Sequence, residues 1–265
     1  MNRSGYFVMV LILSICFLAG CEEPSRKASN SDAAQIELSE QMFIKDVLKE
    51  KGVRNIKIIL DKLSVRQSEF GPLEKLWEQV DTDAAKPSNR KEFKKSGIRA
   101  GVVGEDFITQ MDDIRKTLDD KIRRRDALII SNDESGYMNF AKGPDVSQFY
   151  YSGKWYNSSD YDLSKAPRSL RITARRLKSN KTLVEVSPLL YSFFKTQSPF
   201  GNNLNFIDAG FKAVVPDGKC IVIGRRTKGK NDLAEALFTG QGEFTKMETL
   251  LVITPYFMAH LRPPE

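Results

Sequence analysis

The sequence predicts an α+β protein, in which a small strand and helix module at residues 36–125 precedes a mainly antiparallel β domain at residues 126–265. Two observations carry this prediction. Upstream of residue 126, apolar residues recur with the period of a strand and then with that of a helix. Downstream, short β-type runs are separated by turns rich in Gly, Pro, Asn, Asp and Ser. This order of elements is typical of an α+β architecture.

The chain opens with the pattern of an export signal. A short polar segment with Arg3 precedes an apolar stretch, residues 6–18, that is short for a transmembrane helix. The tetrapeptide Leu18-Ala19-Gly20-Cys21 resembles the lipobox of bacterial lipoproteins, in which cleavage precedes the cysteine and the cysteine is lipidated. The resemblance implies a signal peptide at residues 1–20 and a lipid, such as palmitate, on Cys21. An ordinary secretory signal or an uncleaved anchor is the alternative.

The residues after Cys21 indicate where the protein is held. Glu22 occupies the position at which an aspartate favours inner-membrane retention in enteric bacteria, so the lipobox resemblance implies an outer-membrane anchor facing the periplasm. Residues 21–35 are polar and lack apolar periodicity, which predicts a flexible tether. Cys16 leaves with the signal and Cys21 takes the lipid, so Cys220 has no cysteine to pair with and no intrachain disulfide is expected.

Composition favours a folded domain with a modest positive charge. Hydrophobic residues make up 41% of the chain and charged residues 28%, as in ordinary globular proteins. Lys and Arg exceed Asp and Glu by 41 to 34, and loss of Arg3 with the signal lowers the excess from +7 to +6. In an envelope protein this excess favours anionic lipid or polysaccharide over nucleic acid, so no nucleic-acid partner is expected.

The α+β module is expected to contain two strands and three helices. Residues 36–52 predict a short helix, 54–66 a strand, 71–84 a helix, 94–104 a second strand and 105–125 a long amphipathic helix. The inward face of the last helix is expected to hold Phe107, Ile108, Met111, Ile114 and Leu118. The basic run Arg123–Arg125 would then end this helix, where the helix dipole favours positive charge.

The β domain shows alternation with one polar face. In RSLRITARRL, Leu170, Ile172 and Ala174 alternate with polar residues, and after the turn SNKT the alternation continues, so residues 169–188 predict a β-hairpin. Asp217-Gly218 separates the runs AVV and CIVI, which is the turn chemistry of a second hairpin.

The last 90 residues, taken as an ordered set, resemble the C-terminal domain of bacterial secretins, the outer-membrane ring proteins of type II and III secretion and type IV pilus systems. The resemblance spans LRITARRLKSNKTLVEVSP, FKAVVPDGKCIVIG and ALFTGQGEFTKMETLLVITPYFM. The best-matched positions are Pro216, Asp217, Gly218, Ile223, Gly224, Leu237, Phe238, Thr254 and Pro255. Secretins usually carry Gly-Gly where this chain has Gly224-Arg225, and a Pro- and Gly-containing segment of their barrel where it has KGKNDLAEA. The resemblance implies a secretin-like domain, with or without a pore.

This resemblance implies a non-enzymatic cell-envelope lipoprotein that acts in envelope assembly or protein secretion as a structural or interaction component. Its partners would be the membrane, through Cys21, and either further copies or another envelope protein, through β edges. The alternative is a glycan- or peptidoglycan-binding module. Its candidate contacts are Tyr150, Tyr151, Trp155 and Tyr156, unless these rings only pack a hairpin on the sheet.

The sequence gives little support for nucleotide binding, metal binding or nucleophilic catalysis. Gly224, Gly229 and Lys230 have the spacing of a phosphate-binding loop, but Asn231 replaces the required hydroxyl and the Asp-Gly turn argues against a parallel β-α-β unit, so no nucleotide or other cofactor is expected. His260 is the only histidine, which excludes a His-based triad or a multi-histidine metal site. Cys220 lies in an apolar run, which favours a buried small side chain over a nucleophile.

Overall fold

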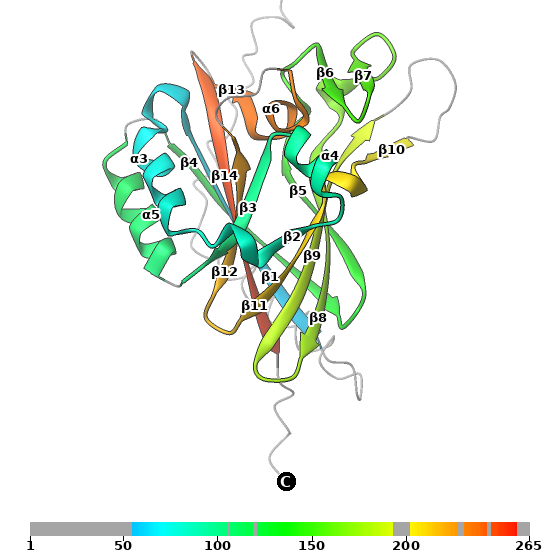
Figure 1. Cartoon of the computed structure of the whole chain (residues 1–265). Helices are drawn as coiled ribbons and strands as arrows, with labels where there is room; N and C mark the ends of the chain where they lie inside the picture. Colours follow the sequence, from blue (N-terminus) through cyan, green and yellow to red (C-terminus); the bar gives the residue numbers. More distant parts are fainter. Residues whose placement is uncertain are drawn as a thin grey trace, which may run out of the picture. The chain divides into compact units, whose positions relative to one another are not determined.

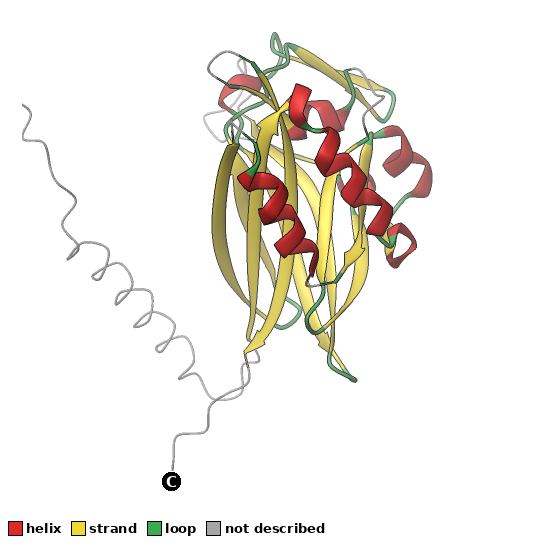
Figure 2. Ribbon diagram, turned by 90° about the vertical axis from the view of Figure 1, so that its left-hand side faces the viewer, coloured by secondary structure: helices red, strands yellow, loops and turns green. Residues whose placement is uncertain are grey.

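A computed structural model of the chain describes residues 55–104, 106–118, 121–192, 202–226, 231–242 and 245–258. They belong to one compact unit. Its strands form two six-stranded sheets that pack face to face and a separate two-stranded sheet, and two helices lie against the outer face of one large sheet (Figures 1 and 2). The expected signal, lipidation site Cys21, tether and first helix lie outside the described residues. The fold class is α+β with antiparallel strand pairing, as the sequence predicts.

Sheet A has the strand order β3-β12-β14-β1-β4, and β13 also pairs with β14. Its strands are β1 (Asn55–Arg66), β3 (Ile98–Val103), β4 (Lys121–Ser131), β12 (Cys220–Arg225), β13 (Thr239–Gln241) and β14 (Lys246–Met258). The long central strand β1 pairs with β14 from Asn55↔Met258 to Arg66↔Met247. Sheet A is therefore built from both ends of the described chain.

Sheet B has the order β2-β11-β9-β8-β5, and β10 pairs with β9. Its strands are β2 (Ala85–Pro87), β5 (Ser135–Ala141), β8 (Arg168–Leu177), β9 (Lys181–Ser192), β10 (Asn202–Asn205) and β11 (Phe211–Pro216). The predicted hairpin is confirmed as β8–β9, whose turn places Ser179 and Asn180 at φ 67° and 53°. Leu170, Ile172 and Ala174 are buried while Arg171 is exposed, so the predicted polar face is also confirmed.

The two faces of sheet A bury two different cores. Between the sheets, apolar side chains such as Ile58 and Ile253 from sheet A meet Ile172 and Val186 from sheet B. On the outer face of sheet A, α3 (Gly71–Lys75) and α5 (Asp106–Lys116) cover a second cluster. Its members include Leu63, Val222, Leu250, Leu73, Phe107 and Met111. Each fully buried side chain of this size contributes about 1.5–3 kcal/mol, so both faces of sheet A stabilise the fold.

The remaining elements lie around the sandwich. They are α4 (Arg90–Lys95), α6 (Leu233–Phe238), β6 (Gln148–Tyr151), β7 (Lys154–Asn157), and the 3-10 helices η1 (Gln67–Glu69), η2 (Leu76–Gln79), η3 (Thr82–Ala84), η4 (Leu163–Lys165) and η5 (Ile207–Ala209). All six residues of α6 are buried, and Phe238 stacks on Phe140 of β5 with ring centroids 6.0 Å apart. This short helix therefore fills part of the core instead of lying on the surface.

The boundary expected between residues 125 and 126 is corrected by the strand pairing. It falls inside β4, and β1 from the upstream segment lies between β4 and β14 of sheet A. Ser64 Oγ and Thr249 Oγ1, from the two expected domains, lie 2.8 Å apart in the interior. Because β1 has its ladder partners on both sides of the expected boundary, residues 55–258 fold as a single unit.

The long helix expected at residues 105–125 is also corrected. Helix α5 ends at Lys116, and the basic run Arg123–Arg125 lies in strand β4. Arg123 and Arg125 point to the same side of this strand and share the buried carboxylate of Asp61 on β1. Cross-strand pairing with Asp61, and not a helix dipole, accounts for the position of these arginines.

The Asp217-Gly218 turn is present, but it does not make a hairpin. Gly218 has a φ of 78°, in the left-handed region that favours glycine. The strand before the turn, β11, belongs to sheet B, whereas the strand after it, β12, belongs to sheet A. The turn therefore carries the chain from one sheet to the other, and β12 pairs with β14 and β3 in place of β11.

Candidate interaction site

Each large sheet ends in two edge strands with a ladder partner on one side only, β3 and β4 in sheet A and β2 and β5 in sheet B. Within the described part of the chain, β4 pairs with β1 alone and β5 with β8 alone. An edge strand of this kind presents N–H and C=O groups to which another strand can add. The edges differ in charge, since β2 carries Lys86 and β3 carries Arg99. Along β4 the run Arg123–Asp126 carries four charges, which disfavours indiscriminate pairing, whereas β5 (SGYMNFA) carries none.

Strand β5 is the element that the sequence analysis missed. Its alternation is visible in hindsight, because Met138 and Phe140 are buried while Tyr137 is 49% exposed. Tyr137 makes an edge-to-face contact with Tyr191, with ring centroids 6.3 Å apart. The register shifts between Asn139 and Ala141, which indicates a bulge near the end of the edge. The uncharged edge of β5 is therefore short and ends in an irregularity.

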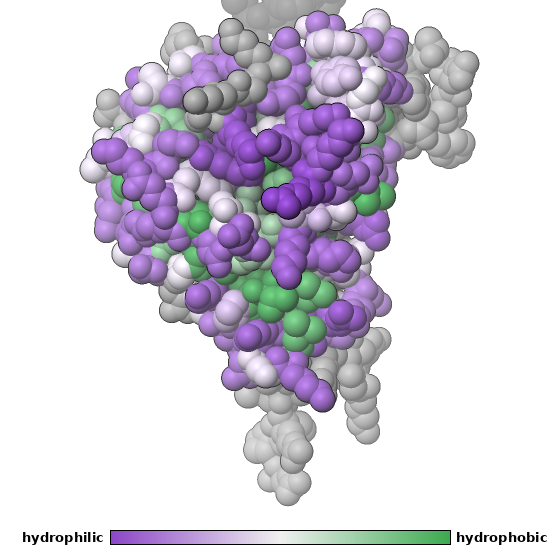
Figure 3. All heavy atoms as spheres, viewed as in Figure 1, coloured by the Kyte–Doolittle hydropathy of each residue, from purple (hydrophilic) through white to green (hydrophobic). Residues whose placement is uncertain are grey.

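The outer face of sheet B is exposed and hollowed in two places. One hollow, of about 350 Å³, is polar, and within it Lys212 Nζ lies 2.8 Å from Glu185 Oε1. The other, of about 360 Å³, is lined by Ala84, Leu183, Val214 and the stems of Lys86 and Lys212. Figure 3 shows an apolar area on the lower half of this side of the molecule. Val214 is 44% exposed, so this face offers apolar contact area beside charged groups.

The aromatic stretch forms the small hairpin β6–β7. Tyr150 and Trp155 are cross-strand partners, with ring centroids 5.4 Å apart in an edge-to-face arrangement. They are 44% and 47% exposed. The backbone N–H of Tyr150 donates to the carbonyl of Asn231 at 2.7 Å, which fixes the hairpin beside α6. Of the four candidate ligand contacts, these two rings are the ones that reach solvent.

The other two candidate contacts pack inward. Tyr151 is buried, and its burial raises the pKa of its phenol. Tyr156 stacks on Phe149 at 5.0 Å between centroids and also meets Phe206. Tyr151 therefore belongs to the core, which corrects the expectation that it faces a ligand. Tyr156 is half-buried, so only part of its ring is open to a ligand.

The positions that resemble those of secretins lie in the turn between the two sheets and at buried sites in the sandwich. Pro216 ends β11, and the Asp217-Gly218 turn that follows links the sheets. The Asp217 carboxylate accepts from Nη2 of Arg176 at 2.8 Å, and this pairing holds the pKa of Asp217 below its usual value. The remaining matched positions are Ile223 and Gly224 in β12, Leu237 and Phe238 in α6, and Thr254 and Pro255 in β14, and all six are buried.

Arg225, at the position of the second glycine in secretins, belongs to a buried ionic cluster. Its guanidinium lies 3.6 Å from the Glu235 carboxylate and 3.9 Å from that of Glu248. Lys246 Nζ donates to Glu235 Oε1 at 2.6 Å. Burial raises the pKa of Glu248 from its ordinary 4.5 to about 7, although nearby cations oppose the shift. The cluster ties α6 to β12 and β14.

The structure also places residues that the sequence offered for other chemistry. Strand β12 is antiparallel to both neighbours, which differs from the parallel β-α-β unit of a phosphate-binding loop, while Gly229 and Lys230 lie outside the described residues. Cys220 is buried, as predicted. Within the described ranges, no group of three or more His, Cys, Asp or Glu side chains could hold a metal ion. No helix there is long and apolar enough to cross a membrane.

No family model matches the chain, and no curated protein matches its sequence. Similar solved structures include the type II secretin GspD of enteropathogenic Escherichia coli, at 10% identity and a TM-score of 0.29, covering 85% of this chain and 74% of that one. The InvG secretin-domain β-barrel of the Salmonella SPI-1 injectisome has 11% identity and a TM-score of 0.30, with 88% and 70% covered. The V. cholerae type IV competence pilus secretin PilQ has 14% identity and a TM-score of 0.28, with 85% and 65% covered. These TM-scores make the likeness a partial one.

Proposed function

We propose that this protein is a non-enzymatic cell-envelope lipoprotein, anchored to the outer membrane through a lipid on Cys21 and facing the periplasm. Its secretin-like sandwich acts in envelope assembly or protein secretion by pairing a strand edge with another copy or with another envelope protein. The observation that carries this proposal is the uncharged edge of β5, which pairs with β8 alone among the described strands. A strand added there gains main-chain hydrogen bonds and shape-dependent side-chain contacts.

The secretin-like sequence positions support the proposal independently. Their order along the chain matches that of secretins, and in this structure they form the turn between the sheets, the buried helix α6 and the central strand β14. These are the parts that hold the two sheets together. Two proteins that share this sandwich need similar residues at such positions, whereas the choice of binding partner depends on strand edges and loops.

The proposal is tested by the mass of the native particle, extracted in mild detergent and measured by light scattering. We expect the wild type to be heavier than one chain. Tyr137→Glu should reduce the mass toward that of one chain, because it places a charge on β5. Arg171, the cross-strand partner of Tyr137, can face the new carboxylate, so the fold should tolerate the change.

Ile207→Glu is the matched control, because Ile207 is 56% exposed and lies in η5, which packs against α4 and β9. It should leave the mass unchanged. A wild-type particle with the mass of one chain and no envelope partner in crosslinking would overturn the proposal. An equal loss of association in both variants would show that any added charge has this effect, and would count against the β5 edge.

Glycan or peptidoglycan binding is a second candidate function, favoured by the exposed pair Tyr150 and Trp155. Rings of this kind stack on sugars while polar neighbours supply hydrogen bonds. Trp155→Ala should abolish retention of the protein on purified cell-wall material. Tyr256→Ala, at a 50% exposed ring on β14, should not. Absence of wild-type retention would end this alternative.

A further inference from the structure

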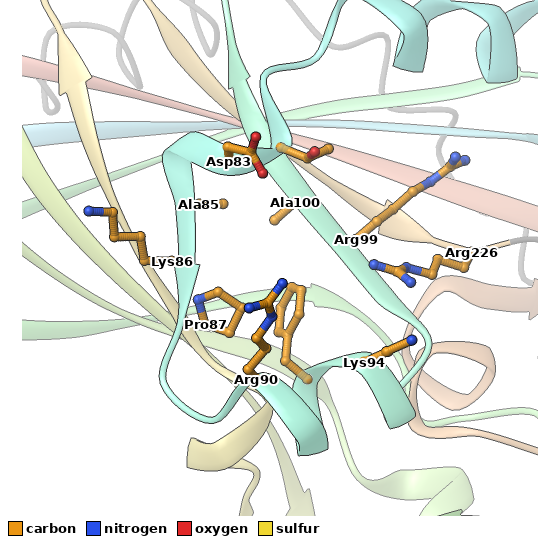
Figure 4. A pocket seen from close by; sticks show the side chains of 11 residues that line it. Asp83, Ala85, Lys86, Pro87, Arg90, Lys94, Arg99, Ala100 and Arg226 are labelled. Carbon is orange, nitrogen blue, oxygen red and sulfur yellow. The ribbon is translucent and has the colours of Figure 1, made fainter.

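A groove of about 610 Å³ lies between β2, α4 and β3, next to the end of β12. Its floor is formed by the buried side chains of Ala85, Phe93 and Ala100. Four exposed cations line the groove together with polar residues of η3, and Figure 4 shows Lys86 directed away from the other three, Arg90, Lys94 and Arg226. We propose that this groove binds an anionic ligand through its phosphate group.

The three cations come from two separate parts of the chain. Arg90 and Lys94 are four residues apart on α4 and so project from one face of the helix. Arg226 follows β12, and its backbone N–H donates to the carbonyl of Gly97 at 2.8 Å, which fixes the point at which its side chain leaves the backbone. Figure 4 shows the guanidinium of Arg226 directed toward the groove from beside β3, with Arg90 and Lys94 on the helix at the same end. The fold thus brings like charges together in a concave place.

Carboxylates near the groove are directed elsewhere. Glu92 of the same helix pairs with Lys95 at 3.4 Å. Glu74 binds Arg99 on the other face of β3, where Nη1 of Arg99 lies 2.6 Å from Oε1 of Glu74 and its guanidinium stacks 4.0 Å from the Trp77 ring centroid. Arg99 therefore lines the groove without offering it a charge.

Among the described residues, no carboxylate lies at ion-pair distance from the cations that remain. Within the described part of the chain, no ion pair involves Arg90, Lys94 or Arg226. Asp83 is the one acidic residue in the lining, and Figure 4 shows it at the opposite end of the groove. Like charges without a counter-charge repel one another and attract an anion. The groove therefore has a positive end that favours an anion, beside its apolar floor.

The chemistry of the positive end points to phosphate. Two planar guanidinium groups and one ammonium group supply donors that match phosphate oxygens, including bidentate pairing by arginine. The apolar floor beside them would accommodate the organic part of a phosphate ester. The binding groups are side chains, so this site is distinct from a loop that cradles phosphate with its backbone. A lipid headgroup and a small free phosphate share this chemistry.

The test uses the full-length protein in mild non-ionic detergent and titrates it by calorimetry at low ionic strength. The probes are inorganic phosphate and dihexanoyl phosphatidylglycerol, with dihexanoyl phosphatidylcholine as a zwitterionic comparison. We expect saturable binding of an anionic probe. A lower Kd for phosphatidylglycerol than for phosphate, with phosphatidylcholine weaker, would identify a lipid headgroup as the ligand source. Equal or tighter binding of inorganic phosphate would identify a free phosphate.

Two double variants with the same loss of charge separate a built site from general attraction. Arg90→Gln/Lys94→Gln should raise the Kd by about tenfold or more, since each lost charge-assisted contact is worth that order. Lys91→Gln/Lys178→Gln, at two exposed lysines outside the lining, should change it less than about twofold. All four side chains are exposed, so both variants should melt like the wild type. No saturable binding of either anionic probe, or an equal loss in the two variants, would overturn the proposal.

Discussion

Arg125 of β4 donates two hydrogen bonds to the buried carboxylate of Asp61 on β1, from Nε to Oδ1 at 2.8 Å and from Nη2 to Oδ2 at 3.0 Å. Arg123 reaches the same carboxylate at 3.2 Å and binds Asp112 of α5 at 2.7 Å. The side chain of Asp61 is 1% exposed. A buried carboxylate with two arginine partners is stable only while both charge and hydrogen bonds are satisfied, so this group joins β1, β4 and α5.

Asp61→Asn should therefore destabilise the protein by about 2 kcal/mol, because it removes a charge that two arginines share while leaving them in place. Arg125 is half exposed, so water recovers part of the loss. Urea unfolding measures the change. Asp113→Asn removes the exposed pair with Lys116 and should cost less than about 0.5 kcal/mol. Equal effects of the two substitutions would contradict the role given to Asp61.

Gly101→Ala should destabilise β3. An added Cβ would lie 2.3 Å from Val80 Cγ1 and 2.7 Å from the carbonyl oxygen of Asp81, and the second of these atoms belongs to the backbone. Relief requires displacement of the bridge between Asp81 and Val102, at a cost of about 1–3 kcal/mol. Gly71→Ala, where a Cβ meets nothing within 4 Å, should change the free energy of unfolding by less than about 1 kcal/mol. A neutral Gly101→Ala would show that Val80 and Asp81 do not lie against β3 as closely as in this structure.

Glu248 should make stability fall as pH rises. Burial raises its pKa from 4.5 to about 7, so between these values the folded state retains a proton that the unfolded state has lost. The stabilisation is complete below about pH 4.5 and is lost as pH rises through about 7, by about 3 kcal/mol over the interval. Glu248→Gln should remove this dependence. Urea unfolding of both proteins from pH 4.5 to pH 8 measures the difference, and parallel curves would contradict the prediction.

Local patterns in the sequence predicted elements well where side-chain alternation and turn chemistry agree. The β8–β9 hairpin and β1 are examples, because each has a clear polar face or apolar period. The pairing of β1 with β14 could not be predicted, since it joins residues about 190 positions apart and depends on complementary faces. For the same reason the Asp217-Gly218 turn was recognised while the separation of its strands into two sheets was not.

The proximity of candidate site residues could be predicted where one short stretch holds all of them. The exposed pair Tyr150 and Trp155 lies within a single hairpin. Side-chain periodicity did not separate the two elements within residues 105–125, because a helix and a strand follow one another there and gave one continuous amphipathic pattern. The strand is recognised only from its pairing with β1, in which Arg125 lies opposite Asp61. The basic groove could not be predicted from the sequence, because its residues are far apart along the chain. Its cations are 136 positions apart in the sequence (226 minus 90) and meet only after β12 returns beside β3.

The central claim is that the β5 edge pairs with a protein partner in the envelope, and photocrosslinking from position 137 in intact cells tests it most directly. A photoreactive residue at Tyr137 should give a discrete adduct with a second copy or with one envelope protein, and the same residue at Ile207 should give none. Absence of an adduct from position 137, or the same adduct from both positions, would contradict the account.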